Sequence, residues 1–128
     1  MSTPEGLVLG AIMDYLKARQ IYAWRNNSGA VKVGTPEASR YVRYGRKGSS
    51  DILGILDDGR FLAIEVKSAK GKATPEQVEF LADITKRGGV AFVARSIEDI
   101  DAHLFQPGYG HEFFGEKKPK GGKKCSTK

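Results

Sequence analysis

The sequence predicts an α/β domain in which helices flank a mixed β-sheet, and three local patterns indicate this fold class. Asp57-Asp58-Gly59 separates two apolar runs, which is typical of a tight hairpin. Glycine accepts and aspartate tolerates the positive φ of such a turn, and the flanking apolar residues favour extended chain. Thr3-Pro4-Glu5 and Thr74-Pro75-Glu76-Gln77 each carry the threonine cap and the proline that start a helix. Residues 90–94 form a short apolar run after the second helix, which favours a central strand parallel to its neighbour.

Length and composition predict one globular domain, residues 1–105, followed by a Lys/Gly-rich tail, residues 106–128, that is expected to be flexible at its end. The formal net charge is +6, but the tail contributes six lysines and two glutamates, so charge alone does not identify a nucleic-acid partner. No apolar run approaches the roughly 20 residues that span a bilayer, and no signal-peptide pattern is present, so no membrane partner is expected. The single cysteine, Cys125, excludes an internal disulfide, and a reducing cytoplasm is the expected compartment.

The first half of the domain is expected to contain a helix and two strands. Residues 21–24 and 40–44 are the expected strands, and residues 25–29 form a polar turn rich in asparagine and glycine. The helix begins at Pro4, because Thr3 caps it and proline suits the first helical position, and apolar residues then recur along it at helical spacing. These residues are Leu7, Val8, Ala11, Ile12, Tyr15 and Leu16.

The second half is expected to contain the hairpin, a helix, a strand and a last helix. The first hairpin strand ends at Leu56, and the second begins at Phe61. The helix that starts after Thr74 stops at Gly88-Gly89, and Ser96 caps the last short helix, which reaches Leu104.

The second hairpin strand carries two charges at its end. Because side chains alternate along a strand, Glu65 and Lys67 share a face with Phe61 and Ala63, and the hairpin folds Asp51 back towards Glu65. Two carboxylates suit Mg²⁺ or Mn²⁺, and an adjacent lysine can orient or deprotonate a water or stabilise charge on an attacked phosphodiester. This combination predicts phosphodiester hydrolysis. The alternative is an exposed Glu65–Lys67 pair on an edge strand, with Asp51 in a capping role.

The pattern as a whole resembles a nuclease family. G-S-S-D at 48–51, E-V-K at 65–67 and T-P-E-Q at 74–77 resemble the PD-(D/E)xK nuclease superfamily and, within it, the virus-type replication-repair nuclease (VRR-NUC) domain. The resemblance covers about residues 5–92. It implies a restriction-endonuclease-like fold with an αβββαβ core.

The resemblance also implies roles for individual residues. Asp51 and Glu65 would bind the metal, with the Val66 carbonyl as a further ligand, and Lys67 would be the catalytic lysine. Two outlying family positions add Glu5 to the metal site and Gln77 to the catalytic group. Each has a structural alternative: a first-turn glutamate stabilises the helix dipole, and Gln77 completes a capping box.

A basic cluster with interleaved tyrosines precedes Asp51, so its charge is expected to arrive beside the metal site and attract a phosphate backbone. The alternative is a solvated strand or loop whose arginines balance nearby acids. The candidate DNA-binding residues are Arg40, Arg43, Arg46, Lys47, Asn27 and Lys70.

These observations predict a Mg²⁺- or Mn²⁺-dependent DNA endonuclease that selects branched DNA by shape. The resemblance implies a phage-type domain, acting in a bacterial host cell, that resolves four-way (Holliday) junctions as a dimer. Two opposed cuts require a C₂ homodimer, for which the tail aromatics Tyr109, Phe113 and Phe114 are one candidate interface.

Three other functions stay open at this point. A non-catalytic DNA-binding module of the same fold would bind DNA without cutting it. A sequence-specific restriction-type endonuclease would give discrete fragments from linear duplex. RNA cleavage uses the same phosphoryl chemistry, and no 2′-hydroxyl sensor is recognisable in the sequence.

Overall fold

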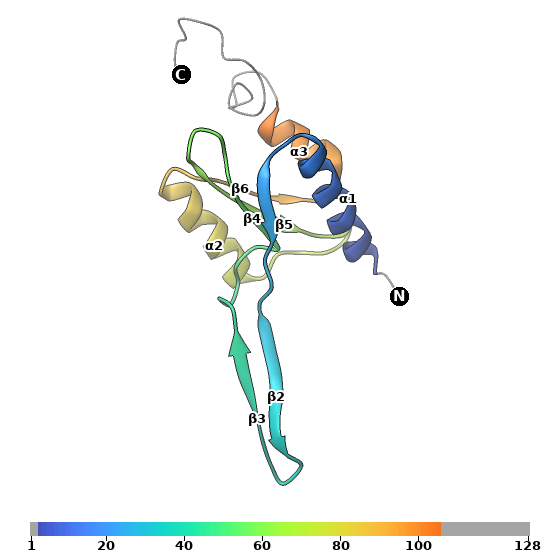
Figure 1. Ribbon diagram of the computed structural model, residues 1–128, viewed down its shortest axis with the longest axis vertical. Coiled ribbons are helices and arrows are strands. Elements are labelled where there is room, and N and C mark those ends of the chain that lie inside the picture. Colours follow the sequence, from blue (N-terminus) through green and yellow to red (C-terminus); the bar gives the residue numbers. More distant parts are fainter. Residues whose placement is uncertain (1–2, 106–128) are drawn as a thin grey trace, which may run out of the picture.

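The computed structural model describes residues 3–105 and contains three helices and six strands in that range (Figure 1). The predicted tail, with its aromatic residues, lies outside the described residues. The elements are α1 (Pro4–Ala18), β1 (Tyr22–Arg25), β2 (Gly29–Thr35), β3 (Ala38–Tyr44), β4 (Ile52–Ile55), β5 (Phe61–Val66), α2 (Pro75–Lys86), β6 (Val90–Ala94) and α3 (Ile97–Leu104). No helix within residues 3–105 is long and apolar enough to cross a membrane.

The body of the protein is a four-stranded mixed sheet in the order β1-β4-β5-β6. β4 is antiparallel to β1 and to β5, whereas β5 and β6 are parallel. The hairpin, the helical crossover through α2 and the parallel strand are therefore confirmed, and so is the αβββαβ order of the core. Helices α1 and α3 cover one face of the sheet and α2 covers part of the other (Figure 1).

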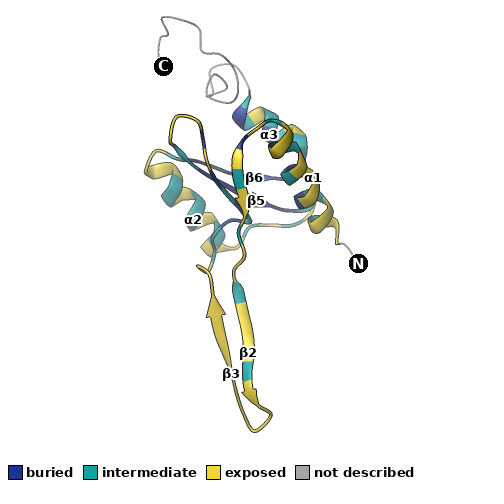
Figure 2. Ribbon diagram, in the orientation of Figure 1, coloured by how far each residue is buried: buried dark blue, intermediate teal, exposed yellow. Residues whose placement is uncertain are grey.

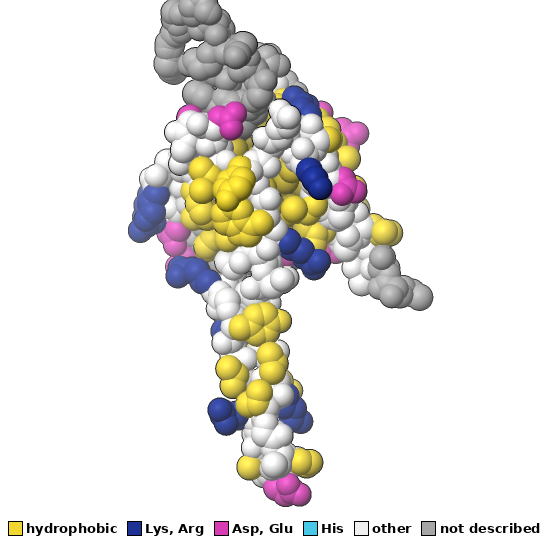
Figure 3. Space-filling view, viewed as in Figure 1, with side chains coloured by type: hydrophobic (Ala, Val, Ile, Leu, Met, Phe, Trp, Pro, Cys, Tyr) yellow, Lys and Arg dark blue, Asp and Glu magenta, His cyan; other side chains and the backbone are white. Residues whose placement is uncertain are grey.

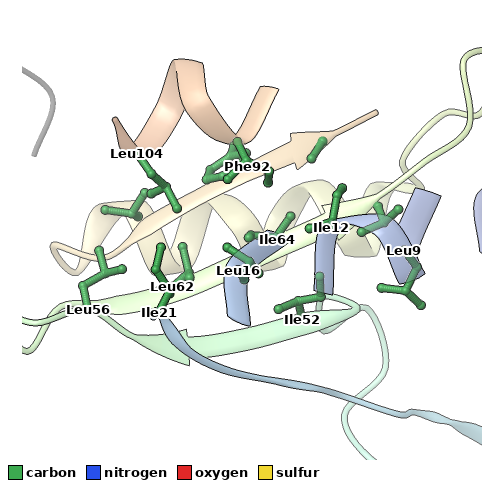
Figure 4. Close-up of a cluster of buried hydrophobic side chains, with 14 residues drawn as sticks. Leu9, Ile12, Leu16, Ile21, Ile52, Leu56, Leu62, Ile64, Phe92 and Leu104 are labelled. Carbon is green, nitrogen blue, oxygen red and sulfur yellow. The ribbon is translucent and has the colours of Figure 1, made fainter. Parts of the chain in front are cut away.

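The core lies mainly between the sheet and helix α1. Ile12 and Leu16 of α1 are fully or almost fully buried against Ile52 of β4 and Ile64 of β5 (Figure 4). β5 lies between β4 and β6, and five of its six residues are buried. Charged side chains at its end are therefore held inside the protein.

The three predicted helix starts, at Thr3, Thr74 and Ser96, are confirmed. Thr3 accepts a hydrogen bond from the Gly6 N–H at 2.9 Å. Thr74 and Gln77 form a capping box: the Thr74 Oγ1 accepts from the Gln77 N–H at 3.2 Å, and the Gln77 Oε1 accepts from the Thr74 N–H at 2.9 Å. These bonds satisfy backbone donors that a helix start would otherwise leave free.

Strands β2 and β3 form a separate two-stranded sheet that projects from the body (Figure 1). We call residues 29–44 the arm. Its residues are exposed or half-buried throughout (Figure 2). The sequence predicted a strand at 40–44 but not at 29–35. The expectation that the basic charge of residues 40–44 arrives beside the metal site was wrong, because the arm carries it away from the body.

Candidate active site

Glu65 and Lys67 lie side by side at the end of the central strand β5. Only 1% of Glu65 and 9% of Lys67 is exposed, and the Lys67 Nζ is 3.4 Å from the Glu65 Oε2. An exposed pair on an edge strand is therefore excluded. Burying two ionisable side chains is costly and adds little stability on its own, so a chemical role accounts better for their position.

Asp51 precedes β4 and lies beside Glu65. Its Oδ2 accepts a hydrogen bond from the Val66 N–H at 2.9 Å, which fixes the carboxylate over the end of β5. The antiparallel pairing of β4 with β5 thus brings Asp51, Glu65 and Lys67 together, as the hairpin predicted.

The electrostatics of the two carboxylates favour a cation between them. Burial, followed by the negative charge of Asp51, raises the pKa of Glu65 to about 8, although the Lys67 ammonium opposes the shift. The Glu65 Oε1 is buried and has no hydrogen-bond partner among residues 3–105. A divalent cation would supply both the missing partner and the missing positive charge.

The donor set fits a hard ion such as Mg²⁺ or Mn²⁺. No group of three or more His, Cys, Asp or Glu side chains converges within the described part of the chain. Mg²⁺ is commonly held by one or two carboxylates together with waters and substrate phosphates. Asp51 and Glu65 are therefore sufficient protein carboxylates, and the Val66 carbonyl stays a predicted further ligand.

Two outlying candidates have different surroundings. Glu5 lines a pocket under the start of α1 together with Asp51, Arg25 and Ser68, but it does not complete a cluster of three carboxylates. Gln77 has its Oε1 engaged in the α2 cap, so the structure gives this oxygen the structural role rather than a place in the metal site. The catalytic role of Gln77 and the ligand role of Glu5 stay predictions.

Asn26, and not the predicted Asn27, contacts the segment that carries Asp51. The Asn26 N–H donates to the Asp51 carbonyl at 2.7 Å, and its Nδ2 donates to the Ser49 Oγ at 2.7 Å and to the Ser50 carbonyl at 2.9 Å. Asn27 is exposed. Sequence reasoning also missed Arg25, which lines the pocket beside Asp51.

The predicted DNA-binding residues other than Asn27 are spread over three places. Arg46 and Lys47 lie against α2, where the Lys47 Nζ is 3.7 Å from the Glu76 Oε2 and the Arg46 guanidinium is 5.9 Å from the centre of the Phe80 ring. Lys70 is exposed in the loop after β5. Arg40 and Arg43 lie on the arm.

The loop that carries Lys70 is fixed by an arginine that the sequence did not single out. The Arg95 Nη1 donates to the carbonyls of Ser68 and Gly71, each at 2.6 Å. These bonds hold the chain that leaves β5.

Gly48 positions the Asp51 segment against α2. Its φ is +83°, and a Cβ there would lie 2.8 Å from the Glu76 carbonyl oxygen. Gly59 has a similar φ of +93°, but a Cβ there would meet nothing within 4 Å. The two glycines therefore differ in their surroundings and not in their backbone.

Alanine at each glycine separates these effects. We expect Gly59→Ala to lower the free energy of unfolding by about 1–2 kcal/mol through the left-handed backbone alone. Gly48→Ala should cost a further 1–3 kcal/mol, roughly, because the segment must also move away from α2. Urea denaturation of both variants measures the difference, and equal losses would contradict this packing role.

Comparison with known proteins identifies the family. The family model of the VRR-NUC domain matches residues 5–98, a range that includes every residue of the site. No curated protein and no solved structure gives a significant match. The match confirms the resemblance and the restriction-endonuclease-like fold class, and nucleases of this family generally use divalent metals. The chain therefore belongs to the VRR-NUC family and is a nuclease of the PD-(D/E)xK type that acts on DNA.

Proposed function

We propose that this nuclease is a Mg²⁺- or Mn²⁺-dependent endonuclease that hydrolyses phosphodiester bonds in branched DNA, and in particular in four-way junctions. One observation carries the metal-dependent chemistry: the Oε1 of the buried Glu65, beside Asp51 and Lys67, has no hydrogen-bond partner among the described residues. A non-catalytic DNA-binding module has no need for a buried carboxylate pair that is costly without a cation.

Each side chain of the site has a separate task in this proposal. Asp51, oriented by the Val66 N–H, and Glu65 would hold the metal. A bound divalent ion supplies Lewis-acid activation of the phosphate and lowers the pKa of water. The contact with Glu65 holds the Lys67 ammonium at the edge of the site. In this position Lys67 orients the attacking water and stabilises negative charge on the phosphate.

The proposed substrate leads to a proposed assembly. One such site cuts one strand, and a two-fold symmetric junction needs two opposed cuts, so we propose a C₂ homodimer. Exposed apolar side chains support it: Tyr22 is 68% exposed and Ile55, its cross-strand partner on β4, is 41% exposed. Figure 3 shows hydrophobic side chains gathered on one face of the body and along the arm, as is common at protein interfaces.

A cleavage assay tests the function directly. Labelled four-way junction, flap, plain duplex and single-stranded RNA are incubated with the protein in Mg²⁺, Mn²⁺ or EDTA. Asp51→Asn serves as the matched variant, because the amide oxygen can still accept from the Val66 N–H while the charge is lost. We expect metal-dependent cutting of branched DNA by the wild type and a loss of at least about 100-fold in the variant.

Other outcomes would replace the proposal. Normal DNA binding without cleavage in either metal would favour the binding module. Discrete fragments from linear duplex, with branching ignored, would favour a restriction-type enzyme. Paired symmetric cuts in the junction, together with a dimeric mass in light scattering, support the homodimer, whereas a monomer that makes single cuts would contradict it.

A further inference from the structure

The two faces of the arm differ in chemistry. Residues that pair directly across antiparallel strands point to the same face, and β2 pairs Lys32 with Tyr41 and Ala30 with Arg43. We call Lys32, Tyr41 and Arg43 the basic face. The opposite face is mainly apolar: Val31 pairs with Val42, Val33 with Arg40 and Gly29 with Tyr44.

The basic face is open and its cations are unbalanced. Lys32 and Arg43 are exposed, and Tyr41 is 71% exposed. Within residues 3–105, neither Lys32 nor Arg43 forms an ion pair. The arm carries a single acid, Glu37, which lies in the turn and not on this face. Charge complementarity therefore favours a polyanion over a second copy of the chain on this face.

The shape of the arm suits double-helical DNA. A two-stranded β-ribbon fits the major groove. Strands of seven residues extend over roughly 23 Å at about 3.3 Å per residue. On B-DNA, with one phosphate per strand every 3.4 Å or so, this length covers about six or seven base pairs.

The base of the arm is joined to the active site. Asn26, three residues before β2, donates hydrogen bonds to the Asp51 carbonyl, the Ser49 Oγ and the Ser50 carbonyl. Just after β3, the Arg46 carbonyl accepts a hydrogen bond from the Ser49 Oγ at 2.7 Å. Both strands of the arm thus connect, within a few residues, to the segment that positions the Asp51 carboxylate. A duplex held by the arm would therefore have a fixed position relative to the cut.

We propose that the basic face of the arm binds the DNA duplex that flanks the scissile phosphate. Lys32 and Arg43 contact phosphates, and the Tyr41 ring packs against the sugar-phosphate wall of the groove. The enzyme accordingly requires about six or seven base pairs of duplex on one side of the cut. This inference rests on the proposed function only in that the cut occurs at Asp51 and Glu65.

Binding and cleavage of DNAs with duplexes of different length test the proposal. The probes are hairpin-closed duplexes of about 6 and 18 base pairs, two lengths chosen around the expected contact length. Each duplex is used alone in the binding assay and as one branch of the branched DNA in the cleavage assay. Fluorescence anisotropy in EDTA at several salt concentrations compares the wild type with Lys32→Ala, Tyr41→Ala and Arg43→Ala. Arg40→Ala removes the same charge from the opposite face of β3, and Lys86→Ala removes a charge in the last turn of α2, outside the arm.

The proposal predicts a face-specific and length-specific loss. Arg43→Ala should weaken binding to the long duplex about 5–10-fold and reduce the slope of log affinity against log salt by about 1. Tyr41→Ala should weaken binding severalfold with little change in that slope. The loss for Arg40→Ala should be smaller than for Arg43→Ala, and the advantage of the long duplex should shrink only in basic-face variants.

Several results would overturn it. Equal losses from Arg40→Ala and Arg43→Ala would show attraction without a defined face. Losses of the same size on both duplex lengths would exclude the flanking contact, and a changed oligomeric mass with unchanged affinity would assign the face to a second copy. Metal-dependent cleavage that persists with unaltered KM in the basic-face variants would remove this inference alone, whereas a wild type that cuts no DNA would remove the proposed function.

Discussion

Lys67→Ala should reduce the rate of DNA cleavage by about 10³-fold, which is the size of effect expected when a group that activates water or stabilises transition-state charge is removed. DNA affinity should stay within about twofold, because a buried ammonium contributes one charge among many to a phosphate surface. Single-turnover cleavage of branched DNA in Mg²⁺ gives the rate, and anisotropy in EDTA gives the affinity.

Two controls accompany this experiment. Lys72→Ala removes an exposed lysine five residues further along the chain and should leave the cleavage rate within about twofold. Circular dichroism checks that the Lys67 variant is folded. We expect it to fold near pH 7, because the high pKa of Glu65 keeps that carboxyl largely protonated when the Lys67 ammonium is removed. Unchanged cleavage in a folded Lys67→Ala protein would rule out the role proposed for this lysine.

The parts of the fold that depend on local chemistry were predicted from the sequence. The turn at Asp57-Asp58-Gly59, the cap at Thr74 and the apolar strand at 90–94 each contain their own signal, and the hairpin formed at the first of them brings Asp51 to Glu65. The parallel pairing of β6 with β5 followed from the helix between them.

The strand at 29–35 and its pairing with the predicted strand at 40–44 could not be predicted, because the arm has no buried face. Residues 29–35 carry glycine, lysine and threonine among three β-branched or small apolar residues, and their burial does not alternate as it would in a core strand. The direction in which the arm projects depends on the bonds of Asn26 to the Asp51 segment, which are tertiary contacts. Two adjacent asparagines also give the sequence no means of selecting Asn26 over Asn27.

Glu5 and Gln77 each have two candidate roles, a structural role at a helix start and a role in the site that the family resemblance implies. Local structure accounts for each side chain: Glu5 is the acidic residue in the first turn of α1, and Gln77 accepts a hydrogen bond from the Thr74 N–H in the α2 cap. Helix-start chemistry and site chemistry use the same residue types, so spacing alone cannot separate them. Glu5 lines the pocket beside Asp51, and a metal-binding titration of Glu5→Gln would distinguish the two roles.

Glu65→Gln should make the metal-free protein more stable at alkaline pH and remove one component of its pH dependence. The pKa of Glu65 is about 8 in the folded chain against an ordinary value of 4.5, so between these values the unfolded chain ionises this carboxyl while the folded chain keeps its proton. The contribution of Glu65 to the free energy of unfolding therefore falls as pH rises from about 4.5 to about 8, and it levels off above that range.

The size of this effect follows from the same two pKa values. At about 1.4 kcal/mol per pH unit, the gap sets an upper limit of about 5 kcal/mol, and a loss of roughly 2–4 kcal/mol is expected once the buried site relaxes. Urea denaturation in EDTA at pH 5, 6.5 and 8 measures wild type and Glu65→Gln in parallel, and the difference between the two curves isolates this carboxyl from the others.

Added Mg²⁺ distinguishes a metal ligand from a carboxyl that is merely buried. A cation between Asp51 and Glu65 favours the ionised form, so Mg²⁺ should stabilise the wild type more at pH 8 than at pH 5, where protons compete for Glu65. Glu65→Gln should gain much less from Mg²⁺ at either pH. A pH-independent difference between the two proteins in EDTA would show that Glu65 ionises normally in the fold. An equal gain from Mg²⁺ in both proteins would place the cation elsewhere, and the buried pair at the end of β5 would then be a structural feature and not the catalytic centre.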